Sequence, residues 1–205
     1  VKVQGKYKKQ SGGHGQFGDV WIEFEPSGDM SKQYVFEEKV FGGSVPKQYF
    51  PAVEKGLQEC ISTGVLAGYP VVGLKATLVD GSYHPVDSSE MAFKMATSVA
   101  FKDGVAKAKP TILEPIAHVE IVVPEKYMGD IMGDVNKRRG RILSMDPADG
   151  GKKCIVSEIP LAEIAKYSID LRSMTQGRGS YHFNFERYEE APGDVQQKVI
   201  ESRAK

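Results

Sequence analysis

The sequence predicts an α+β protein of two domains, each built from a sheet with helices packed on it. Two kinds of hydrophobic spacing support this class: short segments alternate apolar and polar residues with a period of two, and longer segments repeat apolar residues at helical spacing. The rhythm changes between Pro110 and Glu114, where a proline-containing segment separates two sets of elements. Within the 205 residues we predict one domain at 1–112 and a second at 113–205.

The first predicted domain mixes strands and helices. Val20, Ile22 and Phe24 alternate with neighbours of different character, which is typical of a strand with two different faces. Apolar residues recur at helical spacing from Phe50 to Ile61, and Pro46 is suited to the first turn of that helix. The predicted elements are strands at 20–25, 34–41 and 72–78 and helices at about 46–63 and 90–107.

The second predicted domain has the order β-α-β-β-α-β. Met128, Ile131, Met132 and Val135 fall at i, i+3, i+4 and i+7, which indicates an amphipathic helix. A turn-rich segment at 146–151 joins two short strands into a hairpin. The elements are strands at 119–123, 141–145, 153–159 and 180–185, helices at 128–135 and from 161 onward, and a short helix in the tail at 191–205. This order is that of the split βαβ, or ferredoxin-like, fold.

Composition narrows the classes of function. Hydrophobic residues make up 40% and charged residues 26% of the chain, and no apolar run approaches the ~20 residues that span a bilayer, so we expect no membrane partner. The first residue is Val1 rather than methionine, and we expect a piece of a longer protein. Cys60 and Cys154 lack the number and spacing of a disulfide framework or zinc site, which favours buried free thiols in a reducing cytoplasm.

Positive charge is local and not global. The 27 basic residues balance 27 acidic ones, unlike a uniformly basic nucleic-acid binder. Four lysines occur without an acid in the first ten residues, and a second cluster includes Arg138 and Arg139. Such clusters are either solvated faces or contacts for RNA, and composition leaves both readings open.

A glycine-rich segment runs from Gly12 to Gly18. It is not a nucleotide-binding P-loop, because no Lys-Ser or Lys-Thr pair follows and the next predicted element is a strand. Nothing else in the chain fits a phosphate-binding or dinucleotide fingerprint, so no catalytic site is expected here. The glycines either let a backbone approach RNA phosphates closely or form a flexible hairpin tip.

A second loop contains Ser82, Tyr83, His84 and Pro85. A Ser-His-Asp triad is not expected, because the three residue types lie within a few positions of one another and Asp87 and Ser88 fit a helix cap better. Tyr83 and His84 have the side chains that stack on bases or donate to a ribose hydroxyl. Further on, an arginine between two glycines, Arg178, is either a phosphate clamp or a solvated turn. No residues show metal-ligand spacing.

Taken in order, these segments resemble the last two domains of bacterial elongation factor G over essentially the whole chain. Many ordered matches make the resemblance far more specific than a single glycine-rich loop. The matching stretches are 11–18, 45–53, 66–72, 81–84, 86–90, 113–116, 137–140, 171–173 and 177–178.

The resemblance implies a βαβ, ribosomal-protein-like first domain and a ferredoxin-like second domain. It also implies that this part has no cofactor, and that GTP and Mg²⁺ bind a GTPase domain missing from it. The implied partners are the decoding region of the small ribosomal subunit with its tRNA and mRNA, and the GTPase-associated region of the large subunit. The implied role is tRNA–mRNA translocation in protein synthesis, in the cytoplasm.

The resemblance also implies which residues contact RNA. The contacting set is Gly12, Gly13, His14, Gly15, Gln16, Ser82, Tyr83, His84, Pro85, Arg138, Arg139 and Arg178. Two positions depart from the family pattern, because His14 replaces the usual arginine and Pro85 replaces a common acidic residue. These departures fit a paralogue that acts in ribosome recycling or rescue, which is the alternative function.

Overall fold

The structure is a computed structural model, and it describes residues 1–204 as two compact units. The first unit comprises Val1–Pro110 together with residues 194–204, and the second comprises Thr111–Gly193. The predicted domains, 1–112 and 113–205, assign the tail to the second domain, whereas the contacts of the structure group it with the first unit. One such contact is between the Arg203 guanidinium and the Tyr69 ring, whose centroid is 4.2 Å away. The tail helix is α5 (Gly193–Arg203).

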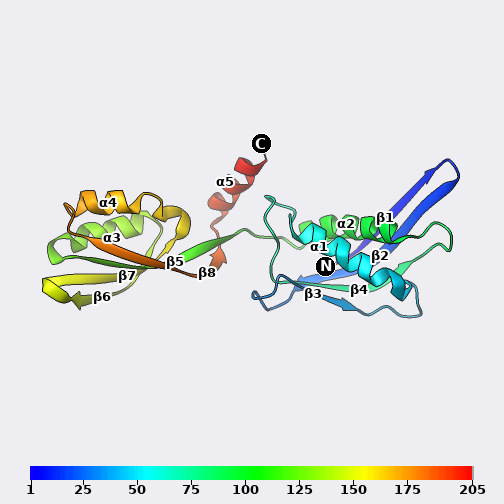
Figure 1. Cartoon of the computed structure of the whole chain (residues 1–205), viewed down its shortest axis with the longest axis horizontal. Helices are drawn as coiled ribbons and strands as arrows, with labels where there is room; N and C mark the ends of the chain where they lie inside the picture. The colour runs from blue at the N-terminus through cyan, green and yellow to red at the C-terminus, as the bar shows by residue number, and fades with distance from the viewer. Residues whose placement is uncertain (205) are drawn as a thin grey trace. The chain divides into compact units, whose positions relative to one another are not determined.

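The first unit contains a four-stranded sheet with α1 and α2 on one face (Figure 1). The strand order is β1-β2-β4-β3, with β3 parallel to β4 and the other pairs antiparallel. The elements are β1 (Lys2–Ser11), β2 (His14–Pro26), β3 (Tyr34–Glu38), η1 (Lys47–Tyr49), α1 (Phe50–Ile61), β4 (Leu74–Ser82) and α2 (Glu90–Lys107). Val20, Ile22 and Phe24 point into the core, as their alternation predicts.

The strand β1 was not predicted from the sequence. Its buried positions are Val3 and Gly5, and the second of these has no side chain, so the sequence shows little apolar alternation. Gly5 is needed because a Cβ there would lie 2.0 Å from the carbonyl oxygen of Ala96 on α2. The strand pairs with β2 in a hairpin and packs closely against a helix that lies far away in the sequence.

The second unit has the predicted β-α-β-β-α-β order. Its sheet is antiparallel with the order β6-β7-β5-β8, and α3 and α4 cover one face (Figure 1). The elements are β5 (Leu113–Pro124), η2 (Glu125–Tyr127), α3 (Met128–Lys137), β6 (Arg141–Ala148), η3 (Asp149–Gly151), β7 (Lys152–Pro160), η4 (Leu161–Ile164), α4 (Tyr167–Met174) and β8 (Ser180–Glu190). The predicted α+β class with a ferredoxin-like second domain is confirmed.

Several predicted boundaries were wrong. The helix expected from Leu161 is a short 3-10 turn, and α4 starts only at Tyr167, because Lys166 adopts a left-handed conformation with φ of 64°. The strand expected to reach Phe41 ends at Glu38, and Phe41 is exposed. The two thiols, expected to be buried, are free and only half-buried. Among the described residues, no helix is both long and apolar enough to cross a bilayer.

Candidate functional site

The candidate site lies at one end of the first unit, where the β1–β2 hairpin extends beyond the helices (Figure 1). Ser11 pairs with His14, so the hairpin turns through only two residues, Gly12 and Gly13. Their φ angles of 54° and 112° lie in the region that glycine adopts most easily. The loop expected over Gly12–Gly18 is therefore wrong in extent: it is a two-residue turn, and the following residues belong to β2.

Gly18 and Gly15 serve close packing and not flexibility. A Cβ on Gly18 would lie 2.4 Å from the carbonyl oxygen of Ala92 at the start of α2. A Cβ on Gly15 would lie 2.6 Å from a carboxylate oxygen of Asp87. The two glycines thus let the hairpin lie against α2 and against the loop that precedes it.

Two residues of the second loop bind the hairpin. The Asp87 carboxylate accepts a hydrogen bond from the Gly15 N–H at 3.2 Å, and the Asp87 carbonyl accepts one from the Phe17 N–H at 2.9 Å. The Ser88 hydroxyl donates to the Phe17 carbonyl at 2.9 Å and accepts from the His84 N–H at 2.8 Å. The hairpin and the loop are therefore held as one body.

This arrangement corrects the role expected for Asp87 and Ser88. The residue that caps α2 is Ser89, whose side chain accepts the Ala92 N–H at 3.1 Å. Asp87 and Ser88 lie just before the cap, where their side chains are free to reach the hairpin. Sequence reasoning could not distinguish these uses, because both need a short polar side chain before a helix.

Tyr83 and His84 are two of the exposed side chains of the second loop. Tyr83 is 48% exposed, and the His84 side chain is 52% exposed. The Nδ1 atom of His84 accepts hydrogen bonds from the N–H groups of Val86 at 3.2 Å and Asp87 at 3.1 Å. The ring is thus fixed to the backbone of its own loop.

Ser82, which precedes these two residues, has its side chain engaged within the unit. Its hydroxyl donates to the Asp19 carboxylate at 2.6 Å, and the other carboxylate oxygen accepts from the Gln4 amide at 2.8 Å. Asp19 is 6% exposed, so this interaction lies under the loop. Ser82 therefore supports the loop from below.

A hollow of about 250 Å³ lies between the hairpin and the loop. Its lining residues are Lys8, Lys9, Gln10, Gly15, Gln16, Phe17, His84 and Asp87. The carboxylate of Asp87 is the one acidic group among them and is already hydrogen-bonded to Gly15. The two lysines are exposed, so the rim of the hollow is cationic and suited to an anion. The predicted contacting set named Gly15, Gln16 and His84 but left out the two lysines, which strand pairing brings opposite Phe17 and Gln16.

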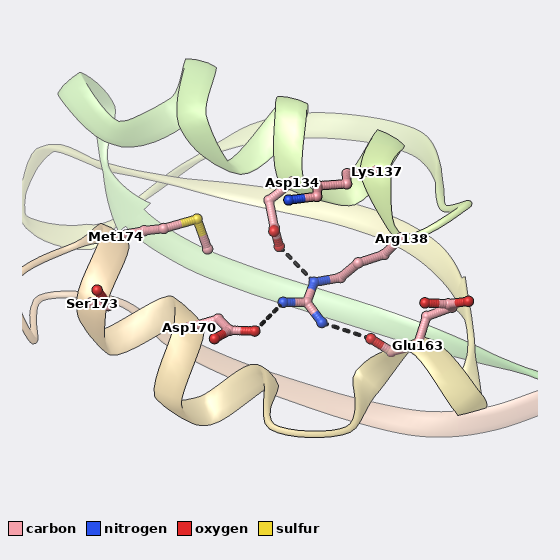
Figure 2. Close-up of a pocket in the computed structure, with 7 residues that line it drawn as sticks. All are labelled: Asp134, Lys137, Arg138, Glu163, Asp170, Ser173 and Met174. Atoms are coloured by element: carbon pink, nitrogen blue, oxygen red, sulfur yellow. Dashed lines mark hydrogen bonds and ion pairs between the residues drawn. The ribbon is translucent and has the colours of Figure 1, made fainter.

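Arg138 lies in a different environment, in a groove of about 460 Å³ between α3 and α4. Figure 2 shows its guanidinium between Asp134 on α3 and Asp170 on α4. It donates to Asp134 at 2.7 Å, to Asp170 at 2.5 Å and to the carbonyl of Glu163 at 2.7 Å. It also lies 4.8 Å from the centroid of the Tyr167 ring, and its side chain is only 12% exposed.

Arg139 is also paired within the second unit. Its guanidinium donates to both carboxylate oxygens of Glu114, at 2.9 and 3.0 Å, and to Glu163 at 3.2 Å. These hydrogen bonds, chiefly those to Glu114, raise the pKa of Arg139 above its ordinary value. The structure thus places Arg138 and Arg139 in ion pairs that join elements of the second unit.

Arg178 occupies an exposed turn between α4 and β8. Gly177 has a φ of 77°, and the buried Thr175 hydroxyl accepts the Gly179 N–H at 2.9 Å, which fixes the turn on both sides of the arginine. Within residues 1–204, no ion pair engages its guanidinium. In that same range no cluster of His, Cys, Asp and Glu is placed to hold a metal ion.

Comparison with known proteins adds independent observations. The family described as elongation factor G, domain IV, matches residues 1–109, and the family described as elongation factor G C-terminus matches residues 111–199. A crystal structure of a protein from Thermus thermophilus superimposes with a TM-score of 0.82 at 45% sequence identity. The match covers 99% of this chain and 30% of that protein, so the chain spans about a third of the length of this relative.

Proposed function

Because the chain belongs to the elongation factor G family, as its domain IV and C-terminus, we propose that it is the ribosome-contacting part of a translational GTPase that promotes tRNA–mRNA translocation. Neither matched family is a GTPase domain, so the chain itself is not one. In this proposal GTP and Mg²⁺ bind elsewhere in a longer parent protein, and the protein works on cytoplasmic ribosomes.

The observation that carries the proposal is the joined hairpin end of the first unit. Gly15 and Phe17 of the hairpin are hydrogen-bonded to Asp87 of the second loop, so both loops move together. A stiff, cationic end can be placed against RNA without losing conformational freedom on contact. We propose that this end enters the decoding region beside tRNA and mRNA and acts sterically and electrostatically.

The set of residues that we propose to contact RNA differs from the predicted set. Gly12, Gly13, His14, Gln16, Tyr83, His84 and Pro85 stay in it, and Lys8 and Lys9 join it because they line the hollow. Arg178 stays a proposed contact of the second unit with large-subunit RNA. The proposal does not rest on Gly15, whose N–H is bound to Asp87. Nor does it rest on Ser82, Arg138 or Arg139, because their side chains are engaged within their own units.

The experiment measures two activities of the full-length parent. Movement of mRNA by one codon is followed on pre-translocation ribosomes with GTP, and subunit splitting is followed by light scattering. We expect mRNA movement. Efficient splitting without movement would instead establish the recycling alternative, which the departures at His14 and Pro85 favour.

A charge substitution tests the hairpin end itself. Lys9→Gln removes one cation from the hollow, and Lys32→Gln removes one from the segment that joins the opposite end of β2 to β3. We expect Lys9→Gln to weaken ribosome binding by several-fold and to lower its salt dependence, while Lys32→Gln changes neither. Equal effects of the two substitutions would contradict the proposal that the hairpin end is placed against RNA.

A further inference from the structure

The hydrogen-bond pattern of His84 restricts where its ring carries a hydrogen. Two backbone N–H groups, from Val86 and Asp87, point at Nδ1 at 3.2 and 3.1 Å. An atom that accepts from two donors presents its lone pair and has no hydrogen of its own. A neutral imidazole carries one hydrogen in total, so it must lie on Nε2.

Neighbouring residues hold this arrangement in place. Pro85 has no N–H and a fixed φ, so the chain between His84 and the two donors is stiff. The Ser88 hydroxyl accepts the His84 N–H at 2.8 Å and donates to the Phe17 carbonyl at 2.9 Å, which fixes the backbone of His84 to the hairpin. The charged group facing the ring is the Asp87 carboxylate, 3.6 Å from Nδ1, and it is engaged by the Gly15 N–H.

Nε2 is the ring nitrogen left for a partner outside the protein. The side chain is 52% exposed and lines the cationic hollow. Resting on the function proposed above, we infer that His84 contacts RNA as a neutral imidazole that donates one hydrogen bond from Nε2, with Nδ1 held by its own loop. Lys8 and Lys9 supply the positive charge at this site, and His84 supplies a directed donor for an acceptor atom of the RNA.

The ring state is tested on this chain without ribosomes. Histidine labelled with ¹⁵N gives distinct long-range proton–nitrogen correlations for the two neutral tautomers, and His84→Gln assigns the signals. At pH 8, we expect the neutral His84 ring to carry its hydrogen almost wholly on Nε2, because Nδ1 accepts from two N–H groups. A mixture like that of free imidazole, or a hydrogen on Nδ1, would overturn the inference.

The donor role is tested by two substitutions that each keep one ring function. Gln carries an amide donor near the position of Nε2, and Asn carries an acceptor near the position of Nδ1. For the full-length parent bound to ribosomes, we expect His84→Gln to stay within about 2-fold of the unmodified affinity and His84→Asn to lose about 3- to 10-fold. The reverse order, or no effect of either, would overturn the donor role.

Salt dependence separates a neutral donor from a cation. A cation that neutralises a phosphate contributes about 0.7–0.9 to the slope of log affinity against log salt. We expect His84→Asn to leave that slope unchanged and Lys9→Gln to reduce it. A reduced slope for His84→Asn would mean an imidazolium and would overturn the inference. A parent that binds ribosomes but moves no mRNA would reject the proposed function alone, because the ring state and the affinities are measured independently.

Discussion

The two units use clustered polar side chains in opposite ways. In the second unit, Arg138 and Arg139 have their guanidinium groups surrounded by carboxylates from neighbouring elements, and Arg138 is 12% exposed. At the hairpin end of the first unit, internal hydrogen bonds are made by Asp87 and Ser88, while Lys8, Lys9 and His84 remain exposed. A cluster of basic residues in a sequence therefore does not identify a nucleic-acid contact. What matters is which charges the fold itself neutralises.

The largest expected effect comes from Arg138→Ala. It leaves Asp134 without its partner in a groove where that side chain is 14% exposed, and we expect the second unit to lose about 3–4 kcal/mol of stability. Arg178→Ala, on an exposed turn, should stay within about 0.5 kcal/mol. The sole tryptophan, Trp21, lies in the first unit, so its fluorescence in urea follows the unfolding of that unit. Circular dichroism follows both units, and the transition that fluorescence does not show is that of the second unit. Equal effects would remove the contrast between the two arginines.

A second prediction concerns the attachment of the hairpin to α2. The Cβ of Gly5→Ala would lie 2.0 Å from a backbone oxygen, so strand and helix must separate, and we expect a loss of about 2–3 kcal/mol. Gly12→Asn is the matched control, because no atom lies within 4 Å of that Cβ and Asn tolerates a positive φ in a hairpin turn. Trp21 fluorescence in urea measures both variants. A stable Gly5→Ala would show that the hairpin does not depend on this packing.

The third prediction uses pH to probe the ion pairs of the second unit. Hydrogen bonds from Arg187, and to a smaller extent from Arg141, lower the pKa of the Glu158 carboxyl from 4.5 to about 2. A lowered pKa stabilises the folded state above pH 4.5, and that contribution is lost as the pH falls toward 2. Because Arg141 is largely exposed, we expect Glu158→Gln to cost only about 1–2 kcal/mol at pH 7 and to flatten the stability profile between pH 4.5 and 2. Glu186→Gln, on the exposed strand β8, should leave the profile unchanged.

The smallest expected effect tests the joint between the two loops. Asp87→Ala removes the acceptor of the Gly15 N–H, and we expect a local loss of about 1 kcal/mol. Amide hydrogen exchange at Gly15 measures it directly, because the opening is local. Asp87→Asn keeps an acceptor oxygen and should restore most of the protection. If exchange at Gly15 is the same in all three proteins, the carboxylate does not hold the hairpin.

Sequence spacing predicted most of the elements, since period-two and helical patterns are local properties. The segments at Val20–Phe24 and Met128–Val135 lie where their spacing places a strand and a helix. The pattern failed at β1, where Gly5 occupies a core-facing position, and at Leu161, where a left-handed Lys166 interrupts the helix. In both cases a single residue serves packing or chain direction, which apolar periodicity does not record.

The sequence by itself determined the α+β class, the order of elements in the second unit and the exposed pair Tyr83 and His84. Only the tertiary structure decided that Asp87 joins a hairpin 72 residues away and that Arg138 is enclosed by carboxylates. The physical reason is that periodicity reflects which face of an element is buried. A hydrogen bond or ion pair between distant residues exists only after the packing of helices on a sheet has fixed both partners.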